Sequence, residues 1–242
     1  MCGYIRKFEN FMEYNVVGLD PSLISTAMVV NGKLFNYCRE KDAMNKSGLS
    51  KWFKYCEDKI NLKFINYREF ENYSEGEITK LKDYDKITDQ IIKDIEDNID
   101  KTKPIKIGIE GYSYSSDAGA IIDLVTFSTL LRKKLFDYIS TDITVFSPST
   151  LKLESCKLTY PPINEGKKKE KWVYRNSYGI SGGSLTKHGM FMCIVDNNEI
   201  KDEWSTLCKT MKDDIMAASK VPKPFEDIND SFLIYQILKN NL

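Results

Sequence analysis

Apolar residues near the N-terminus fall into short runs that predict the start of a β-sheet. Residues 16–19 form a β-branched run of the kind that fills a strand buried on both faces. A second run at 27–30 is followed by Asn31 and Gly32, the strongest two-residue hairpin signal. Residues 33–37 would return along it, so the pattern predicts three antiparallel strands, the first of which ends at Asp20.

Helical spacing dominates the pattern beyond these strands. Ile87, Ile91, Ile95 and Ile99 recur at helical spacing, which predicts an amphipathic helix over about residues 77–99. Weaker patterns suggest a short helix around Trp52 and a strand at 62–67. The same reasoning predicts a strand at 105–110, a helix at about 118–138, a strand at 142–146, a short helix capped by Ser149 and Thr150, a helical stripe at 204–215 and a last helix at about 225–239.

Composition is that of a soluble globular protein. The chain has 242 residues, of which 42% are hydrophobic and 29% charged, enough for one large domain or two small ones. No apolar run approaches the roughly 20 residues that span a bilayer. Residues 1–14 lack the apolar core of a signal peptide. We therefore expect a cytoplasmic protein without membrane contact.

Cysteine and histidine usage narrows the chemistry. The six cysteines are scattered without a C-x-x-C pair, which argues against a zinc knuckle and favours buried thiols in a reducing compartment. His188 is the only histidine, so a Ser-His-Asp triad elsewhere and a poly-histidine metal site are excluded. If the protein is an enzyme, carboxylates carry its chemistry.

Charge is balanced overall but uneven along the chain. The net charge is zero, so the field of the whole molecule does not indicate a nucleic-acid partner. Residues 83–100 are strongly acidic, whereas 161–190 are rich in lysine. A basic binding surface can therefore exist within a neutral total.

Four acids stand at the ends of predicted elements. Asp20 ends the first strand, Glu110 ends the strand at 105–110, and Asp227 and Asp230 open the last helix on one face. Each has an ordinary explanation, since Asp caps turns and acids suit the first turn of a helix. Their order along the chain is the more informative feature.

That order resembles the RuvC-like Holliday-junction resolvases of the RNase H-like superfamily. The motifs are VVGLDPS, IGIEGYS and PKPFEDINDS, in the order of that family and spread over most of the chain. The resemblance implies a single α/β domain over 1–242, with an RNase H-like (RuvC-type) fold and a central mixed five-stranded sheet flanked by helices. It also implies metal-binding catalytic acids at Asp20, Glu110, Asp227 and Asp230, and cleavage of branched DNA by paired nicks.

Phosphodiester hydrolysis gives a physical reason for such a set of acids. Two metal ions about 3.5–4 Å apart generate the attacking hydroxide and stabilise the leaving oxygen. Mg²⁺ prefers oxygen ligands, and we expect Mn²⁺ to substitute for it. On this interpretation Asp20 bridges two ions, Glu110 and Asp230 complete the site, and Asp227 orients a water. Crowded carboxylates also repel one another unless a cation lies among them.

Two segments depart from the compact family core. Residues 48–100 and 160–189 are longer than that core needs, and we interpret them as insertions. The resemblance places DNA-contacting lysines between the Glu and the final acids, and the nearest matches are Lys152 and Lys187. The second insertion predicts further DNA contacts at Lys167, Lys168, Lys169 and Trp172, against the simpler alternative of a solvated loop.

A four-way junction has two equivalent strands to cut, which predicts a homodimer with one site per chain. The helix at 118–138 is the candidate interface, because Phe127 and Leu130 fall off its main apolar stripe. The competing arrangement buries both under the segment 48–100. The Lys-, Asn- and Ile-rich composition suggests a phage, a virus or a low-GC bacterium as source, and host cytoplasm for the first two.

Other functions stay open at this point. An RNase H-like nuclease can act on flaps, on RNA–DNA hybrids or on packaging intermediates. An actin-like or sugar-kinase-like ATPase also begins with an Asp at its first hairpin, and Asp117-Ala118-Gly119 is a candidate for its second phosphate loop. A non-catalytic DNA-binding relative would need degenerate acids, whereas all four are present here.

Overall fold

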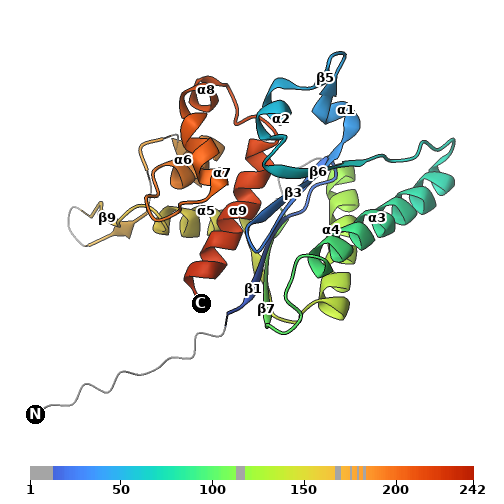
Figure 1. Ribbon diagram of the computed structural model, residues 1–242, viewed down its shortest axis with the longest axis horizontal. Coiled ribbons are helices and arrows are strands. Elements are labelled where there is room, and N and C mark those ends of the chain that lie inside the picture. The colour runs from blue at the N-terminus through green and yellow to red at the C-terminus, as the bar shows by residue number, and fades with distance from the viewer. Residues whose placement is uncertain (1–12, 113–117, 167–169, 175, 179, 182–183) are drawn as a thin grey trace, which may run out of the picture.

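A six-stranded mixed sheet with helices on both faces forms the body of the protein (Figure 1). The computed structural model describes residues 13–112, 118–166, 170–174, 176–178, 180–181 and 184–242. The strand order is β6-β3-β2-β1-β7-β8. These strands are β1 (Asn15–Asp20), β2 (Ser25–Val30), β3 (Lys33–Arg39), β6 (Ile60–Ile65), β7 (Ile105–Glu110) and β8 (Ile143–Phe146).

The first three strands form the antiparallel meander that the sequence predicts. β1 pairs with β2 and β2 with β3, both antiparallel. Asn31 and Gly32 have φ angles of 49° and 86°, the left-handed conformation that a two-residue type I′ hairpin turn requires. The hairpin prediction is therefore confirmed.

The other strands all run parallel to their neighbours. β7 pairs with β1, β8 with β7 and β6 with β3. The carboxyl ends of every strand except β2 therefore lie at one edge of the sheet. The prediction of five strands is wrong by one, because the segment 48–100 contributes β6 as an edge strand. Residues 40–59, which connect β3 to β6, are long enough for the crossover that a parallel neighbour requires.

Two long helices cover one face of the sheet. α3 (Tyr73–Glu96) and α4 (Ala118–Tyr138) lie side by side over it (Figure 1). Phe127 is 1% exposed and packs edge-on against Tyr84 of α3, with ring centroids 5.7 Å apart. Leu130 packs against the same core. The prediction that Phe127 faces a partner subunit is wrong, because Tyr84 of α3 covers it, whereas Leu130 is only half-buried.

The opposite face is covered by α9 (Phe225–Asn240), which is buried along most of its length. A second helical group packs around it and completes this side of the core. Its members are α5 (Pro148–Lys157), α6 (Lys187–Val195), α7 (Glu203–Thr210) and α8 (Lys212–Ala217). The helical stripe predicted at 204–215 is divided between α7 and α8. Trp204, Cys208 and Ile215 of this stripe are buried in the core, as predicted.

Two paired glycines let α9 approach the sheet closely. Gly18 of β1 and Gly108 of β7 are register partners. A Cβ on Gly18 would lie 2.3 Å from the carbonyl oxygen of Ser231 in α9, and one on Gly108 would lie 2.4 Å from Cγ2 of Ile234. A larger residue at Gly18 would collide with helix backbone. The glycines thus set the distance between the helix and the strand ends.

Smaller elements fill the connections. The connection from β3 to β6 contains α1 (Glu40–Ala43), β4 (Met44–Asn45), β5 (Gly48–Leu49) and α2 (Lys51–Cys56). The second insertion contains two short strand pairs, β9 (Ile163–Asn164) with β10 (Trp172–Val173) and β11 (Ile180–Ser181) with β12 (Ser184–Leu185). Ser147 caps α5 by accepting from the Thr150 N–H, so the predicted caps Ser149 and Thr150 lie inside the helix. Among the described residues, no helix is long and apolar enough to cross a membrane.

Candidate metal centre

Three of the four predicted acids meet at the carboxyl edge of the sheet. Asp20 is the last residue of β1 and Glu110 the last of β7. The preceding residues Leu19 and Ile109 are register partners in parallel strands, so the two acids emerge side by side. Asp230 reaches them from the second turn of α9, which the glycine pair holds against these strands.

The carboxylates of Asp20, Glu110 and Asp230 form a compact group. One oxygen of each lies within 4.8 Å of the corresponding oxygens of the other two. Asp230 is 1% exposed, whereas Asp20 and Glu110 are partly exposed. The group is therefore anchored in the protein on one side and open to a substrate on the other.

The electrostatics of this group favour a bound cation. Burial raises the pKa of Asp20 well above its ordinary value, and the charges of Glu110 and Asp230 add to this effect. Burial also raises the pKa of Asp230, to about 7. The positive charge of Lys187 lowers this pKa, whereas the negative charge of Glu110 raises it further. Three carboxylates that are close together and shielded from solvent are costly to ionise together without a positive charge among them.

Lys187 supplies part of that positive charge. It stands in the first turn of α6, where Thr186 caps the helix, and its ammonium pairs with Asp230. Burial opposes its charged form, but the charges of Asp230, Asp20 and Glu110 raise its pKa above the ordinary value. One ammonium among three carboxylates still leaves an excess of negative charge.

The donor set fits a hard divalent cation. All three side chains offer carboxylate oxygens, which Mg²⁺ prefers, and a few of them suffice because Mg²⁺ keeps several waters. Oδ1 of Asp230 is buried and has no hydrogen-bond partner among the described residues. An ion between the carboxylates would satisfy this oxygen.

Asp227 is not part of the group. Although Asp227 and Asp230 are three residues apart on α9, Oδ1 of Asp227 lies 3.1 Å from Nζ of Lys223. Lys223 stands four residues earlier, just before the helix. It is not among the residues that the sequence patterns predict for the site, although an i,i+4 spacing of opposite charges is a recognisable signal.

The predicted DNA-contacting residues are distributed over three places. Lys187 belongs to the acid group, and Lys152 is half-buried on α5. Trp172 is 57% exposed on β10, in the second insertion. Lys167, Lys168 and Lys169 lie outside the described residues.

Arg132 is another residue near the acid group that the sequence patterns do not predict. The guanidinium of Arg132, on α4, lies 4.4 Å from the ring centre of Tyr112, and one of its nitrogens is 3.4 Å from the Glu110 carbonyl oxygen. It therefore ties the end of β7 to α4. Only the packing of α4 on the sheet brings these residues together.

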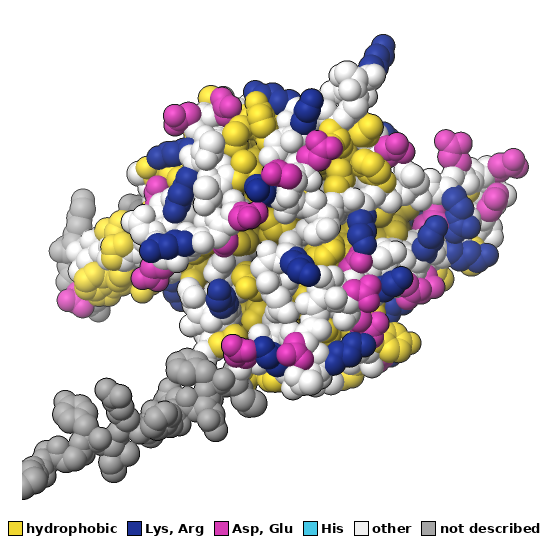
Figure 2. Space-filling view, viewed as in Figure 1, with side chains coloured by type: hydrophobic (Ala, Val, Ile, Leu, Met, Phe, Trp, Pro, Cys, Tyr) yellow, Lys and Arg dark blue, Asp and Glu magenta, His cyan; other side chains and the backbone are white. Residues whose placement is uncertain are grey.

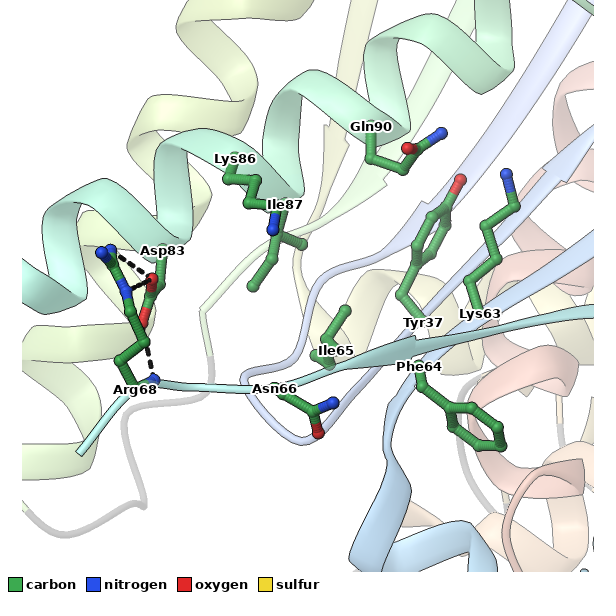
Figure 3. Close-up of a pocket in the computed structure, with 10 residues that line it drawn as sticks. All are labelled: Tyr37, Lys63, Phe64, Ile65, Asn66, Arg68, Asp83, Lys86, Ile87 and Gln90. Carbon is green, nitrogen blue, oxygen red and sulfur yellow. Dashed lines mark hydrogen bonds and ion pairs between the residues drawn. The ribbon is translucent and has the colours of Figure 1, made fainter.

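A cavity of about 350 Å³ lies apart from the acids, between β6 and α3 (Figure 3). Its walls carry the ion pair of Arg68 with Asp83, and the lining residue Lys63 pairs with Asp94. On the face in Figure 2, basic and acidic side chains are interspersed. Among the described residues, Asp20, Glu110 and Asp230 are the acids grouped closely enough to hold a metal ion.

Among known proteins, this chain is similar to solved structures, and the similarity is one of fold. No protein-family model matches the chain, and no curated protein matches it. Among solved structures, it is similar to T. thermophilus RuvC in complex with Holliday junction substrate, at 8% identity and a TM-score of 0.44, over 93% of this chain and 92% of that one. It is also similar to the Thermus thermophilus RuvC structure, at 9% identity and a TM-score of 0.42, over 92% of each chain.

Proposed function

We propose that this protein is a divalent-metal-dependent endonuclease that cuts branched DNA and resolves four-way junctions by paired nicks. The observation that carries the proposal is the group of carboxylates from Asp20, Glu110 and Asp230, within 4.8 Å of one another at an open edge of the sheet. The three motifs that resemble RuvC-like resolvases contain these acids. The motif resemblance supports the choice of substrate.

Each side chain has a role in this proposal. Asp20, Glu110 and Asp230 would together hold the Mg²⁺ ions through their carboxylate oxygens. When bound, the ions supply an activated water and stabilise the charge on the leaving oxygen. Lys187 would hold Asp230 in place and offer its remaining N–H donors to a phosphate oxygen. Lys152, Trp172 and the lysines at 167–169 would contact the DNA arms.

The deciding experiment is a cutting assay on a panel of substrates. Four-way junctions, flaps, linear duplex and RNA–DNA hybrid are incubated with the protein in Mg²⁺, in Mn²⁺ and in EDTA. We expect metal-dependent nicks at symmetric positions in the junction. Asp20→Asn and Glu110→Gln should abolish cutting while the protein stays folded by circular dichroism. Near-full activity in Asp20→Asn would falsify the assignment of the site.

Alternative functions correspond to other outcomes of the same assay. Preference for a flap or a hybrid would identify another RNase H-like nuclease, and binding without cutting would indicate a non-catalytic relative. For the ATPase, the candidate residue Asp117 lies outside the described residues, and Ala118 and Gly119 belong to the first turn of α4. ATP hydrolysis without nuclease activity would support it.

A further inference from the structure

The first turn of α9 carries a second buried acid that is paired with its own cation. Asp227 pairs with Lys223, and the two side chains are 7% and 36% exposed. Oδ2 of Asp227 lies outside hydrogen-bonding geometry to every described donor. Burial raises the pKa of Asp227, and the charge of Lys223 and the nearby Ser25 hydroxyl oppose this effect. A buried carboxylate of this kind holds its ammonium partner firmly, because losing the partner would leave an unpaired charge in the protein.

This pair lies beside the acid group along the same edge of the sheet. Ser25, which faces Asp227, is the first residue of β2, and Asp20 at the end of β1 is the register partner of Ala27 in that strand. Asp230 stands over the ends of β1 and β7, so the two acids of α9 stand over neighbouring strands. Lys223 is close enough to the group for the charge of Asp20 to act on it.

Lys223 has donors left for a ligand. An ammonium has three N–H groups, and the ion pair with Asp227 uses one of them. The side chain is 36% exposed, so it is accessible from solvent at the edge where Asp20 and Glu110 are also partly exposed. A cation fixed beside a site for phosphodiester hydrolysis is placed to meet a phosphate of the bound strand.

We propose that Lys223 binds the DNA phosphate next to the one held at the acid group, and that Asp227 positions Lys223. Asp227 is then a positioning residue and not a fourth metal ligand, in contrast to what the sequence predicts. This inference rests on the proposed nuclease function, because it specifies how the same site holds its DNA. The competing arrangement is one in which Asp227 turns away from Lys223 and binds the metal.

The chain offers a matched control for this ion pair. Lys63 and Asp94 form a pair with side chains 35% and 8% exposed, nearly the same burial as Lys223 and Asp227. Lys63 lines the cavity between β6 and α3 (Figure 3), and none of Asp20, Glu110 and Asp230 lines that cavity. Lys63→Met therefore removes an equivalent pair without removing a cation beside the acids.

The first measurement is the salt dependence of binding to a four-way junction in EDTA. For Lys223→Met we expect roughly tenfold weaker binding. The slope of log K against log salt should fall by about 0.9, the value for the removal of one phosphate interaction in duplex DNA. Lys223→Arg should retain the wild-type slope, and so should Lys63→Met. Circular dichroism and thermal unfolding identify any variant that fails to fold, and the double variant Lys223→Met/Asp227→Asn avoids an unpaired buried charge.

The second measurement is Mg²⁺ affinity, by calorimetry on the same proteins. We expect Asp227→Asn to bind Mg²⁺ as the wild type does, and Asp230→Asn to lose most of its affinity. Weaker Mg²⁺ binding in Asp227→Asn, equal to that in Asp230→Asn, would overturn the positioning role. An unchanged salt slope in both Lys223→Met and the double variant would overturn the phosphate contact.

These outcomes are distinct from failure of the proposed function. If the wild type neither binds nor cuts DNA, the nuclease proposal fails and this inference fails with it. If the wild type cuts junctions and the Lys223 variants keep its salt slope, the inference alone fails. A slope reduced in Lys223→Met and restored in Lys223→Arg supports it.

Discussion

At the scale of single residues, the acid group combines burial with mutual repulsion. Asp20 and Asp230 have raised pKa values, and burial is the first cause in both. Lys187 offsets part of the repulsion through its pair with Asp230. The folded protein without metal therefore holds protons that the unfolded chain releases, and its stability depends on pH in a defined direction.

We expect the free energy of unfolding of the metal-free protein to fall between about pH 5 and about pH 8. Unfolded Asp ionises near pH 4, whereas folded Asp230 ionises at about 7. Across this window the unfolded state binds fewer protons, so a rise in pH favours unfolding. Asp20→Asn removes one group with a raised pKa, so it should reduce this fall in the free energy of unfolding. A pKa difference of one unit between the folded and unfolded states corresponds to about 1.4 kcal/mol.

Urea denaturation in EDTA at the two pH values measures this effect. Asp58→Asn is the control, because it removes a carboxylate that is 75% exposed and not part of the acid group. Saturating Mg²⁺ should stabilise the wild type most at the higher pH, since it binds only the folded site. A steeper fall in Asp20→Asn than in the wild type would contradict this electrostatic account.

At the scale of elements, the site depends on how closely α9 packs against β1 and β7. The two register partners that allow this packing are both glycines, but a Cβ at each would meet different atoms. A Cβ on Gly18 meets helix backbone, at 2.3 Å from the Ser231 oxygen and 2.7 Å from the Tyr235 nitrogen. A Cβ on Gly108 meets side-chain atoms of Ile234 and Leu238, which can move. Backbone that cannot yield transmits the strain to the helix and to Asp230.

We therefore expect Gly18→Ala to be more damaging than Gly108→Ala. Overpacking costs about 1–3 kcal/mol, and Gly18→Ala should reach the upper end or exceed it. It should also weaken Mg²⁺ binding, because α9 must move away from Asp20. Thermal unfolding and calorimetry compare the two variants. Equal effects on both quantities would show that the helix does not rest on Gly18.

The second insertion is the other element with a separate prediction. If its lysines bind the phosphates of the DNA arms, replacing Lys167, Lys168 and Lys169 by Ala should lower the salt slope of junction binding by about 0.9 for each phosphate that is no longer bound. Trp172→Ala should weaken binding through the absence of stacking, with little change in slope. An unchanged slope in the triple variant supports a solvated loop instead.

At the scale of the whole molecule, one chain provides one acid group, whereas a junction has two strands to cut. We propose a twofold homodimer on this ground. Burial of Phe127 removes one of the two interface residues that the sequence suggests, but α4 still exposes Ile122 and Phe136 along one side. Tyr138, the last residue of α4, is exposed as well, and we take Ile122 and Phe136 as the candidates for an interface on this helix.

Light scattering at micromolar concentration, with and without junction DNA, tests the dimer. We expect twice the monomer mass of 28.0 kDa, at least when the junction is bound. Phe136→Glu should shift the protein toward monomer, while Phe64→Glu, at an exposed position on β6, serves as the control. A monomer under both conditions excludes paired nicking and favours a flap or single-nick nuclease.

Strand alternation, hairpin turns and helical spacing are local properties, so the amino-acid sequence was enough to predict the main elements and their approximate ends. It placed Asp20 and Glu110 at strand ends, and the parallel pairing of β1 and β7 then made them neighbours. It also predicted the meander through Asn31 and Gly32, whose conformation is local.

Which acids meet depends instead on packing between distant segments. Residues three apart on a helix differ in direction by about 60°, and this places Asp230 over β1 and β7 but Asp227 over β2 beside Lys223. Likewise, β6 joins the sheet and α3 covers Phe127 through contacts between segments far apart in the chain. Local periodicity shows that a side chain is apolar or acidic, but the neighbour that it meets is set by the tertiary arrangement of the elements.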